Sequence, residues 1–149
     1  AYLDIDNFKS FNDRYGYGRG DEVLIVACRI LTTVVSELAG SEGFVGHVGG
    51  DDFVFMSRPD TIDAICETII KRFDLVIPDF YDREDRLKGY IDSVDRRGNK
   101  EQFPIMSLSI AVVTNDQWIT WQAWLSRLFV DADIRAFADY DEARAWVTE

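Results

Sequence analysis

Four carboxylates stand in two short stretches of the sequence where their type and spacing could bind a cation. Asp4 and Asp6 end an apolar run at the N-terminus, and Asp51 and Asp52 follow a pair of glycines. Adjacent carboxylates repel one another unless a positive charge lies between them. Clusters of oxygen ligands favour hard cations such as Mg²⁺ or Mn²⁺ over zinc. If folding brings the two stretches together, they form a metal site that could serve phosphoryl transfer.

Two strands and a turn must position these carboxylates. Residues 1–5 predict a short buried strand, whose alternation points Asp4 and Asp6 to one side. The apolar runs 44–48 and 53–57 flank Gly49-Gly50, which predicts a tight antiparallel hairpin because glycine takes positive φ without steric cost. Asp51 and Asp52 then occupy the tip of that hairpin. On this stretch alone they could equally be solvated turn residues, since Asp is common beside glycine in turns.

Apolar residues at helical spacing predict the helices of the chain. Short helical turns are expected over 7–13, followed by a link broken by the glycines at 16, 18 and 20. The main helices are predicted over 21–38, with Asp21 as the N-cap, and from Asp60, as a cap, to just before Pro78. A further helix is predicted from Thr120, with its core stripe reaching Ala132. Residues 79–88 indicate a polar, irregular segment.

The remaining apolar runs predict strands. Residues 89–94 and 100–103 indicate a second hairpin, 105–114 is the clearest strand, and 145–148 indicates a short terminal strand. Strands alternate with helices, but the glycine hairpin is antiparallel. The sequence therefore predicts an α/β sandwich in which helices flank a mixed central β-sheet.

Composition restricts the class of protein. The 149 residues suit a single domain, and the formal net charge of −11 argues against non-specific binding of nucleic acid or of anionic membranes. A phosphate ester could bind such a surface only with the help of metal ions. The two cysteines, Cys28 and Cys66, fall on apolar helical faces, as buried reduced thiols do. No signal peptide or long apolar run is evident, so we expect a cytoplasmic domain without membrane contact.

Several motifs follow one another in a fixed order. They are Asp4-Ile5-Asp6-Asn7-Phe8-Lys9, Phe11-Asn12-Asp13, Tyr15-Gly16-Tyr17, Gly20-Asp21 and Gly49-Gly50-Asp51-Asp52-Phe53. Together they resemble the GGDEF domain of diguanylate cyclases, closely over the first third of the chain and more loosely at Ser107-Leu108-Ser109-Ile110. The resemblance implies a nucleotidyl-cyclase-like fold over residues 1–149, as one GGDEF-like domain. We expect this domain to be an N-terminally truncated fragment of a larger multidomain protein.

The resemblance also implies a reaction and its partners. Two such domains face one another, as a homodimer, and each holds one GTP. The 3′-hydroxyl of each GTP attacks the α-phosphate of the other, which gives cyclic di-GMP and pyrophosphate. The cofactor that the resemblance implies is Mg²⁺, or Mn²⁺ in its place.

Site residues carry over by position in these motifs. The resemblance assigns the metal ions to Asp4, the backbone carbonyl of Ile5 and Asp51, and the catalytic carboxylates to Asp51 and Asp52. It assigns guanine recognition to Asn12 and Asp21, although Asp21 could serve only as a helix cap. The other substrate-binding residues are Phe8 and Lys9, through their backbone amides, and Gly49 and Gly50.

The sequence departs from the family pattern at several positions. Asp52 stands in place of glutamate, so its carboxylate falls short by about 1 Å, a misplacement that can cost on the order of 10²-fold in rate. His47 replaces an arginine, and we expect it to tune a neighbouring carboxylate. Tyr17 replaces a histidine, and Tyr140 stands near the position of a phosphate-binding lysine, where Arg144 is the nearest candidate arginine.

Two further features concern regulation. Residues 40–43 lack the Arg-x-x-Asp inhibitory site of the family. Residues 79–100 resemble the insert of GGDDF forms, which are often joined to EAL and CBS domains. We therefore expect EAL, CBS or sensor domains to be linked to this domain in the full protein. Three hypotheses remain open: an active cyclase, a degenerate module that binds GTP and Mg²⁺ to regulate an attached domain, and a structural interaction domain with a relic site.

Overall fold

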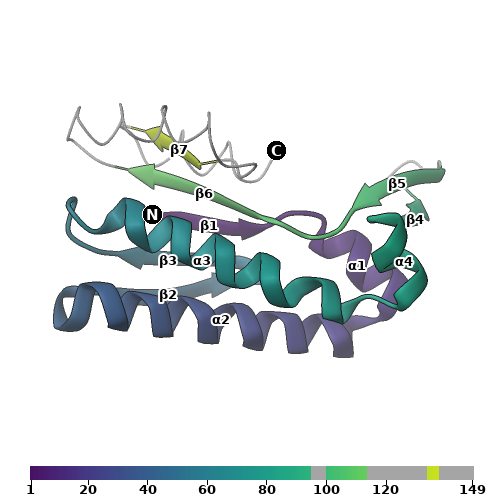
Figure 1. Cartoon of the computed structure of the whole chain (residues 1–149), viewed down its shortest axis with the longest axis horizontal. Coiled ribbons are helices and arrows are strands. Elements are labelled where there is room, and N and C mark those ends of the chain that lie inside the picture. Colours follow the sequence, from purple (N-terminus) through teal and green to yellow (C-terminus); the bar gives the residue numbers. More distant parts are fainter. Residues whose placement is uncertain (95–99, 114–133, 138–149) are drawn as a thin grey trace.

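The computed structural model describes residues 1–94, 100–113 and 134–137, whose arrangement is shown in Figure 1. The strands are β1 (Tyr2–Ile5), β2 (Phe44–Gly49), β3 (Asp52–Met56), β4 (Tyr90–Val94), β5 (Lys100–Pro104), β6 (Leu108–Val113) and β7 (Ile134–Phe137). The helices are α1 (Phe8–Tyr15), α2 (Tyr17–Ala39), α3 (Ile62–Val76) and α4 (Arg83–Lys88), with 3₁₀ turns η1 (Gly40–Glu42) and η2 (Ile77–Phe80). The predicted α/β class is confirmed. The helix expected from Thr120, the strand expected over 145–148, and Tyr140 and Arg144 lie outside the described residues.

The central sheet has the order β2-β3-β1-β6-β7, which places β1 in the middle. β1 is antiparallel to both neighbours, with Leu3 opposite Phe53 on β3 and Asp4 opposite Ser109 on β6. β7 runs parallel to β6, so the sheet is mixed. The sequence analysis did not predict β7. The central position of β1 holds Asp4 between two strands.

The core lies between the sheet and the helices α2 and α3, which both cover the same face (Figure 1). Leu3 and Ile5 point into this core, and Tyr2 packs on the opposite face beside Ala111, as strand alternation requires. Each large apolar side chain that is fully buried contributes roughly 1.5–3 kcal/mol to stability. The same alternation turns Asp4, one residue after Leu3, away from the core.

Helix α2 begins at Tyr17, one turn before the predicted start. Gly16, with φ of 87°, is the one glycine that separates α1 from α2, whereas Gly18 and Gly20 lie inside α2. Their low helix propensity is overridden because α2 buries a long apolar face. The prediction that Asp21 caps this helix is therefore wrong, and its carboxylate is exposed within the first turns of α2.

Helix α2 also corrects the expectation that the chain has no apolar run long enough to cross a bilayer. By length and composition alone, Tyr17–Glu42 qualifies as such a span. In the structure, however, Val23, Ala27 and Leu31 are fully buried against the core of the domain. This packing accounts for one face of α2, whereas Ile25 and Leu38 of the same helix are exposed.

The structure also differs from the sequence prediction at the start of α3. Thr61 precedes the helix, and Asp60, the predicted cap, instead pairs with the guanidinium of Arg58, whose Nε lies 2.9 Å from its Oδ1. Residues 79–88 are not irregular, since they form part of η2 and all of α4. An i,i+4 pair from Lys88 to Glu84, at 2.7 Å, and Gly89 with φ of 79° are the local signals of α4.

The second predicted hairpin is confirmed as β4 and β5, which pair antiparallel in a separate sheet. It lies at the end of the molecule where α1 and α4 lie (Figure 1). The strand predicted from Ile105 begins only at Leu108. The two residues at the start of the predicted strand make hydrogen bonds outside the central sheet. Ile105 N donates to Gly89 O at 3.2 Å, and Met106 N donates to the Tyr81 hydroxyl at 2.9 Å.

The turn from β1 into α1 depends on an unusual backbone conformation at Asn7. This residue has φ of 63° and ψ of 13°, and it is the one non-glycine residue with positive φ in the described part of the chain. Asparagine tolerates this left-handed conformation better than other side chains. The turn sets the directions of both the Ile5 carbonyl and the first amides of α1.

We expect Asn7→Val to destabilise the domain by about 1–2 kcal/mol, because a β-branched residue strains this conformation. Asn7→Gly should stay within about 0.5 kcal/mol of the unaltered protein. Urea unfolding followed by circular dichroism measures both. Equal stabilities for the valine and glycine variants would contradict the strain.

Candidate active site

The acidic residues of the two sequence stretches come together at one end of β1. Leu3 lies opposite Phe53, so the next step along the same register sets Asp4 beside Asp52. Burial, and then the charges of Asp51, Asp52 and Asp6, raise the pKa of Asp4 from 3.8 to about 8. These carboxylates are therefore close enough to repel one another, as the sequence predicted. We call Asp4, Asp51 and Asp52 the acidic group.

Within the described residues, none of the ion pairs involves the acidic group. Burial, opposed by its own backbone amide and reinforced by Asp52, raises the pKa of Asp51 as well. Asp52 Oδ1 is buried and has no hydrogen-bond partner in this part of the chain. An unneutralised cluster of this kind has the electrostatics of a cation site.

The described residues do not, however, form a closed metal cage. No three carboxylate, histidine or cysteine side chains among them converge as ligands. Mg²⁺ usually keeps several waters and binds through one or two carboxylates together with substrate phosphates. Asp4 and Asp51, with the adjoining carbonyl of Ile5, fit this open mode of binding.

A pair of serines at the start of β6, Ser107 just before the strand and Ser109 within it, anchors Asp6, an interaction that the sequence analysis missed. Asp6 accepts hydrogen bonds from Ser107 Oγ and Ser109 Oγ, both at 2.8 Å, and its backbone amide donates to Ser107 O at 3.0 Å. Ser109 also lies opposite Asp4 in the sheet. The alternation of serines along residues 107–109 was the available signal. Asp6 thus fixes the end of β1 beside the acidic group.

The glycine turn before Asp51 is held by His47. Gly49 and Gly50 have φ of 153° and 59°, values that side chains rarely adopt. His47 Nε2 donates to Gly50 O at 2.8 Å, and the imidazole stacks on Phe53 with 4.7 Å between ring centroids. His47 therefore contacts the backbone of the turn, which corrects the expectation that it tunes a carboxylate.

The first turn of α1 follows directly after the acidic strand end. Its N-cap, Asn7, makes no side-chain hydrogen bond to the helix. The first intrahelical bond runs from Phe11 N to Asn7 O at 3.1 Å, so it leaves the amides of Phe8 and Lys9 unused by the helix. Such amides, at the positive end of a helix, can bind phosphate.

Asn12 and Asp21 lie together at the corner between α1 and α2. Asn12 Oδ1 is buried and has no hydrogen-bond partner among the described residues. A Cβ at Gly20 would lie 1.9 Å from that oxygen, so a side chain at this position would displace the amide of Asn12. The corner and the first turn are the two ends of α1, whose eight residues span roughly 12 Å. The structure thus groups the predicted site residues at the two ends of one short helix.

Comparison with protein families identifies the class that this fold and site define. A family model described as "Diguanylate cyclase, GGDEF domain" matches residues 1–88, more than half of the chain. The chain belongs to the diguanylate cyclase GGDEF domain family. Residues 61–148 also match a model described as "SpoIIAA-like". The described strands of that second segment include β6 and β7, which share one sheet with β1.

Individual relatives agree with this assignment. A diguanylate cyclase of Vibrio cholerae is 36% identical over 74 residues, and "Probable diguanylate cyclase DgcF" of Escherichia coli is 47% identical over 76 residues. These matches cover 48% and 49% of this chain but only 22% and 23% of the relatives. The active GGEEF domain of a diguanylate cyclase from Vibrio cholerae shares the fold, with a TM-score of 0.51, 21% identity, and coverage of 93% of this chain and 81% of that one.

Without metal, we expect stability to fall as the pH rises from about 4 to 8. Over this range the unfolded chain has lost the Asp4 proton and the folded chain keeps it, so unfolding becomes more favourable with pH. Because Asp4 is only partly buried, solvent screening limits the effect to about 1 kcal/mol. Asp4→Asn should remove most of this dependence.

Denaturant unfolding in a chelating buffer at pH 5, 6.5 and 8 measures this effect. Asp92→Asn, at an exposed carboxylate of β4, is the matched control and should leave the slope unchanged. Added Mg²⁺ should stabilise the unaltered protein at pH 8 and leave Asp4→Asn nearly unaffected. A pH dependence that is the same in the unaltered protein and in Asp4→Asn would show that Asp4 is ionised at neutral pH in the folded protein.

Proposed function

We propose that this GGDEF domain condenses two GTP molecules into cyclic di-GMP across a pair of domains. The observation that carries the proposal is the acidic group, in which burial, and then the charges of the neighbouring carboxylates, raise the pKa of Asp4 to about 8 without a basic partner among the described residues. A divalent cation with a bound triphosphate would relieve that repulsion. Membership of the family, and the similarity to named diguanylate cyclases, support this reading.

Asp4, Asp51 and the Ile5 carbonyl would hold Mg²⁺, or Mn²⁺, beside the triphosphate. When bound, the metal would neutralise charge on the phosphates and help to ionise the attacking hydroxyl. Asp52 lies next to the same place and would act on the 3′-hydroxyl, either by accepting its proton or by orienting it. The Gly49-Gly50 turn, held by His47, keeps Asp51 and Asp52 at this end of the sheet.

The remaining site residues would orient GTP along α1. The amides of Phe8 and Lys9 would donate to the phosphates, and Gly49 and Gly50 would let the backbone approach them. At the far end of the helix, the Asp21 carboxylate would accept hydrogen bonds from the ring N–H and exocyclic amine of guanine. Asn12, whose Oδ1 has no partner in the described chain, would complete the recognition of the base.

A second copy of the domain is part of the proposed mechanism. Each 3′-hydroxyl forms a bond to the α-phosphate of the opposite GTP, the bond between the α- and β-phosphates breaks, and pyrophosphate leaves. One domain holds only one of the two nucleotides, so catalysis requires two copies. We further propose that the domain is a cytoplasmic GGDDF form, without membrane contact, and that EAL, CBS or sensor domains are linked to it in the full protein.

A regulatory module that binds GTP and Mg²⁺ without turnover is the second candidate function. One oxygen of Asp52 is buried, and the side chain is one methylene shorter than the glutamate of the family pattern. Both features would keep its carboxylate farther from the substrate. Binding through Asp4, Asp51 and the corner residues would persist, while the chemical step would slow.

We expect the purified domain, incubated with GTP and Mg²⁺ and forced to dimerise by fusion to a coiled coil, to form cyclic di-GMP detectable by mass spectrometry. Asp51→Asn should abolish product, while Asp92→Asn should not. Calorimetry of the same samples separates the two candidate functions. Binding of GTP without product would favour the regulatory module, and the absence of both would refute both functions.

Asp52→Glu should raise the rate of cyclic di-GMP formation, since it extends the carboxylate by about 1 Å toward the substrate. The gain should lie between tenfold and about 10²-fold. The affinity for GTP should change by less than about threefold, because Asp52 acts in the chemical step. A glutamate variant that is no faster would show that the length of this side chain does not limit the reaction.

A further inference from the structure

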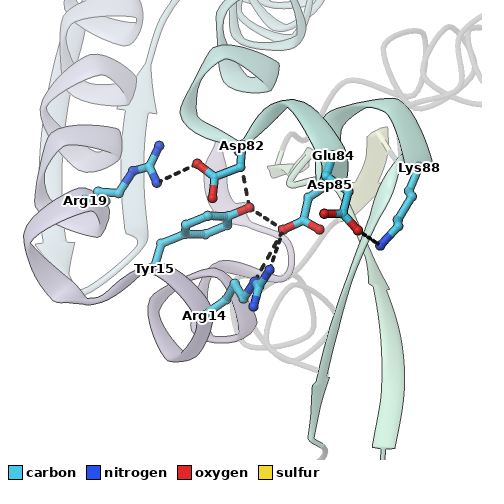
Figure 2. Close-up of polar contacts among 7 residues, drawn as sticks. All are labelled: Arg14, Tyr15, Arg19, Asp82, Glu84, Asp85 and Lys88. Carbon is cyan, nitrogen blue, oxygen red and sulfur yellow. Dashed lines mark hydrogen bonds and ion pairs between the residues drawn. The ribbon is translucent and has the colours of Figure 1, made fainter.

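A cluster of polar contacts, remote from the acidic group, joins the segment before and within α4 to both helices of the α1/α2 corner. Figure 2 shows its members Arg14, Tyr15, Arg19, Asp82 and Asp85. Arg14 and Tyr15 end α1, whereas Arg19 lies in the first turn of α2. We call these five residues the corner clamp.

One carboxylate oxygen ties the clamp to α1. Asp85 is only 3% exposed, and its Oδ2 accepts from the Tyr15 hydroxyl at 2.5 Å and from Arg14 Nε and Nη2, each at 3.3 Å. The hydrogen bond from Tyr15, and next the guanidinium of Arg14, hold the pKa of Asp85 below its ordinary value, although burial opposes them. Asp85 is therefore a buried, charged group whose Oδ2 is held by two side chains of α1.

The other arm of the corner is held through Tyr15 and Asp82. Arg19 Nη1 lies 3.3 Å from Asp82 Oδ1, and its guanidinium stands 4.6 Å above the centre of the Tyr15 ring. The backbone amide of Asp82 donates to the Tyr15 hydroxyl at 3.3 Å. Tyr15 also packs against Phe11 and Tyr81, with centroid distances of 4.9 and 5.6 Å. The clamp thus grips residues on both sides of Gly16.

The corner needs such a restraint because Gly16 alone joins the two helices. Its φ of 87° is accessible to glycine along with many other conformations, and a Cβ there would meet nothing within 4 Å. Neighbouring side chains therefore do not fix the backbone at Gly16 itself. Asn12 lies on one arm and Asp21 on the other, so the angle at Gly16 sets their separation.

We propose that Asp85 is a positioning residue for base recognition. Through Tyr15, Arg14 and the Arg19–Asp82 pair, the clamp fixes the angle between α1 and α2, and so holds Asn12 and Asp21 at the spacing that one purine edge requires. This inference rests on the proposed function, since it takes both residues as readers of guanine. It adds that a residue of α4, which does not itself contact the base, controls how selectively Asn12 and Asp21 bind guanine.

Guanine and hypoxanthine distinguish positioning from general stabilisation. Inosine triphosphate lacks the exocyclic amine that Asp21 would bind, but shares the remaining base edge and the triphosphate. A loosened corner should cost GTP more than inosine triphosphate, because guanine gives the Asp21 carboxylate two hydrogen bonds, from the ring N–H and the amine, whereas hypoxanthine gives it only the one from the ring N–H. A general loss of folding would weaken both nucleotides by the same factor.

The test is calorimetric titration of each nucleotide with Mg²⁺ into the unaltered domain, Asp85→Asn and Tyr15→Phe. Glu84→Gln, which alters a pair with Lys88 on the same helix α4, is the matched control. We expect the unaltered domain and Glu84→Gln to prefer GTP by about tenfold or more. The preference should fall to about threefold or less in both clamp variants. An unchanged preference in those variants, with equal losses for both nucleotides, would overturn the proposal.

Hydrogen exchange separates the failure of this inference from the failure of the proposed function. If the unaltered domain binds neither nucleotide, base recognition is refuted and the proposal falls with the function on which it rests. If it binds both equally, the amine is not read, and the proposal also falls. In either case, exchange at the amides of residues 16–20 still reports on the clamp. Exchange about tenfold faster in Asp85→Asn than in Glu84→Gln supports the corner restraint; equal exchange refutes it.

Discussion

The mutual repulsion of Asp4, Asp51 and Asp52 is the constraint on which the rest of the structure depends. Carboxylates at the end of a central strand cost free energy as long as no cation joins them. The surrounding contacts hold them together in spite of this cost. Strand β1 is paired on both sides, Ser107 and Ser109 hold Asp6, and His47 holds the backbone of the glycine turn. The fold thus holds these carboxylates together where a metal ion with a bound triphosphate would neutralise them.

Helix α1 relates this charged end of the sheet to the corner that carries Asn12 and Asp21. Its first amides follow Asn7, and its last residues belong to the corner clamp. Because the helix is short and rigid, the acidic group and the corner keep a fixed separation. A nucleotide bound along α1 would have its triphosphate at the first amides of the helix and its base at the corner. This order matches the order of triphosphate, ribose and base in the nucleotide itself.

Much of this arrangement could be predicted from sequence because it follows from short-range rules. Alternation in residues 1–5 turns Asp4 away from the core, and glycines before Asp51 make a turn. Propensity rules were wrong at Gly18 and Gly20, where helix packing overrides them. The clamp could not be predicted, since Tyr15 and Asp85 are 70 residues apart and no periodic pattern links them. The charges of 79–88 looked like a solvated loop because only the folded chain buries Asp85.

The path of the chain out of the β4–β5 hairpin has a mechanical consequence. Strand β5 ends at Pro104, and Ser107 already binds Asp6. Of the residues between them, Ile105 is tied to Gly89 and Met106 to Tyr81. The segment between β5 and Ser107 is short and held by hydrogen bonds at both of its residues. A force on the β4–β5 hairpin would therefore be transmitted along the backbone to Ser107 and to Asp6, which Ser107 binds.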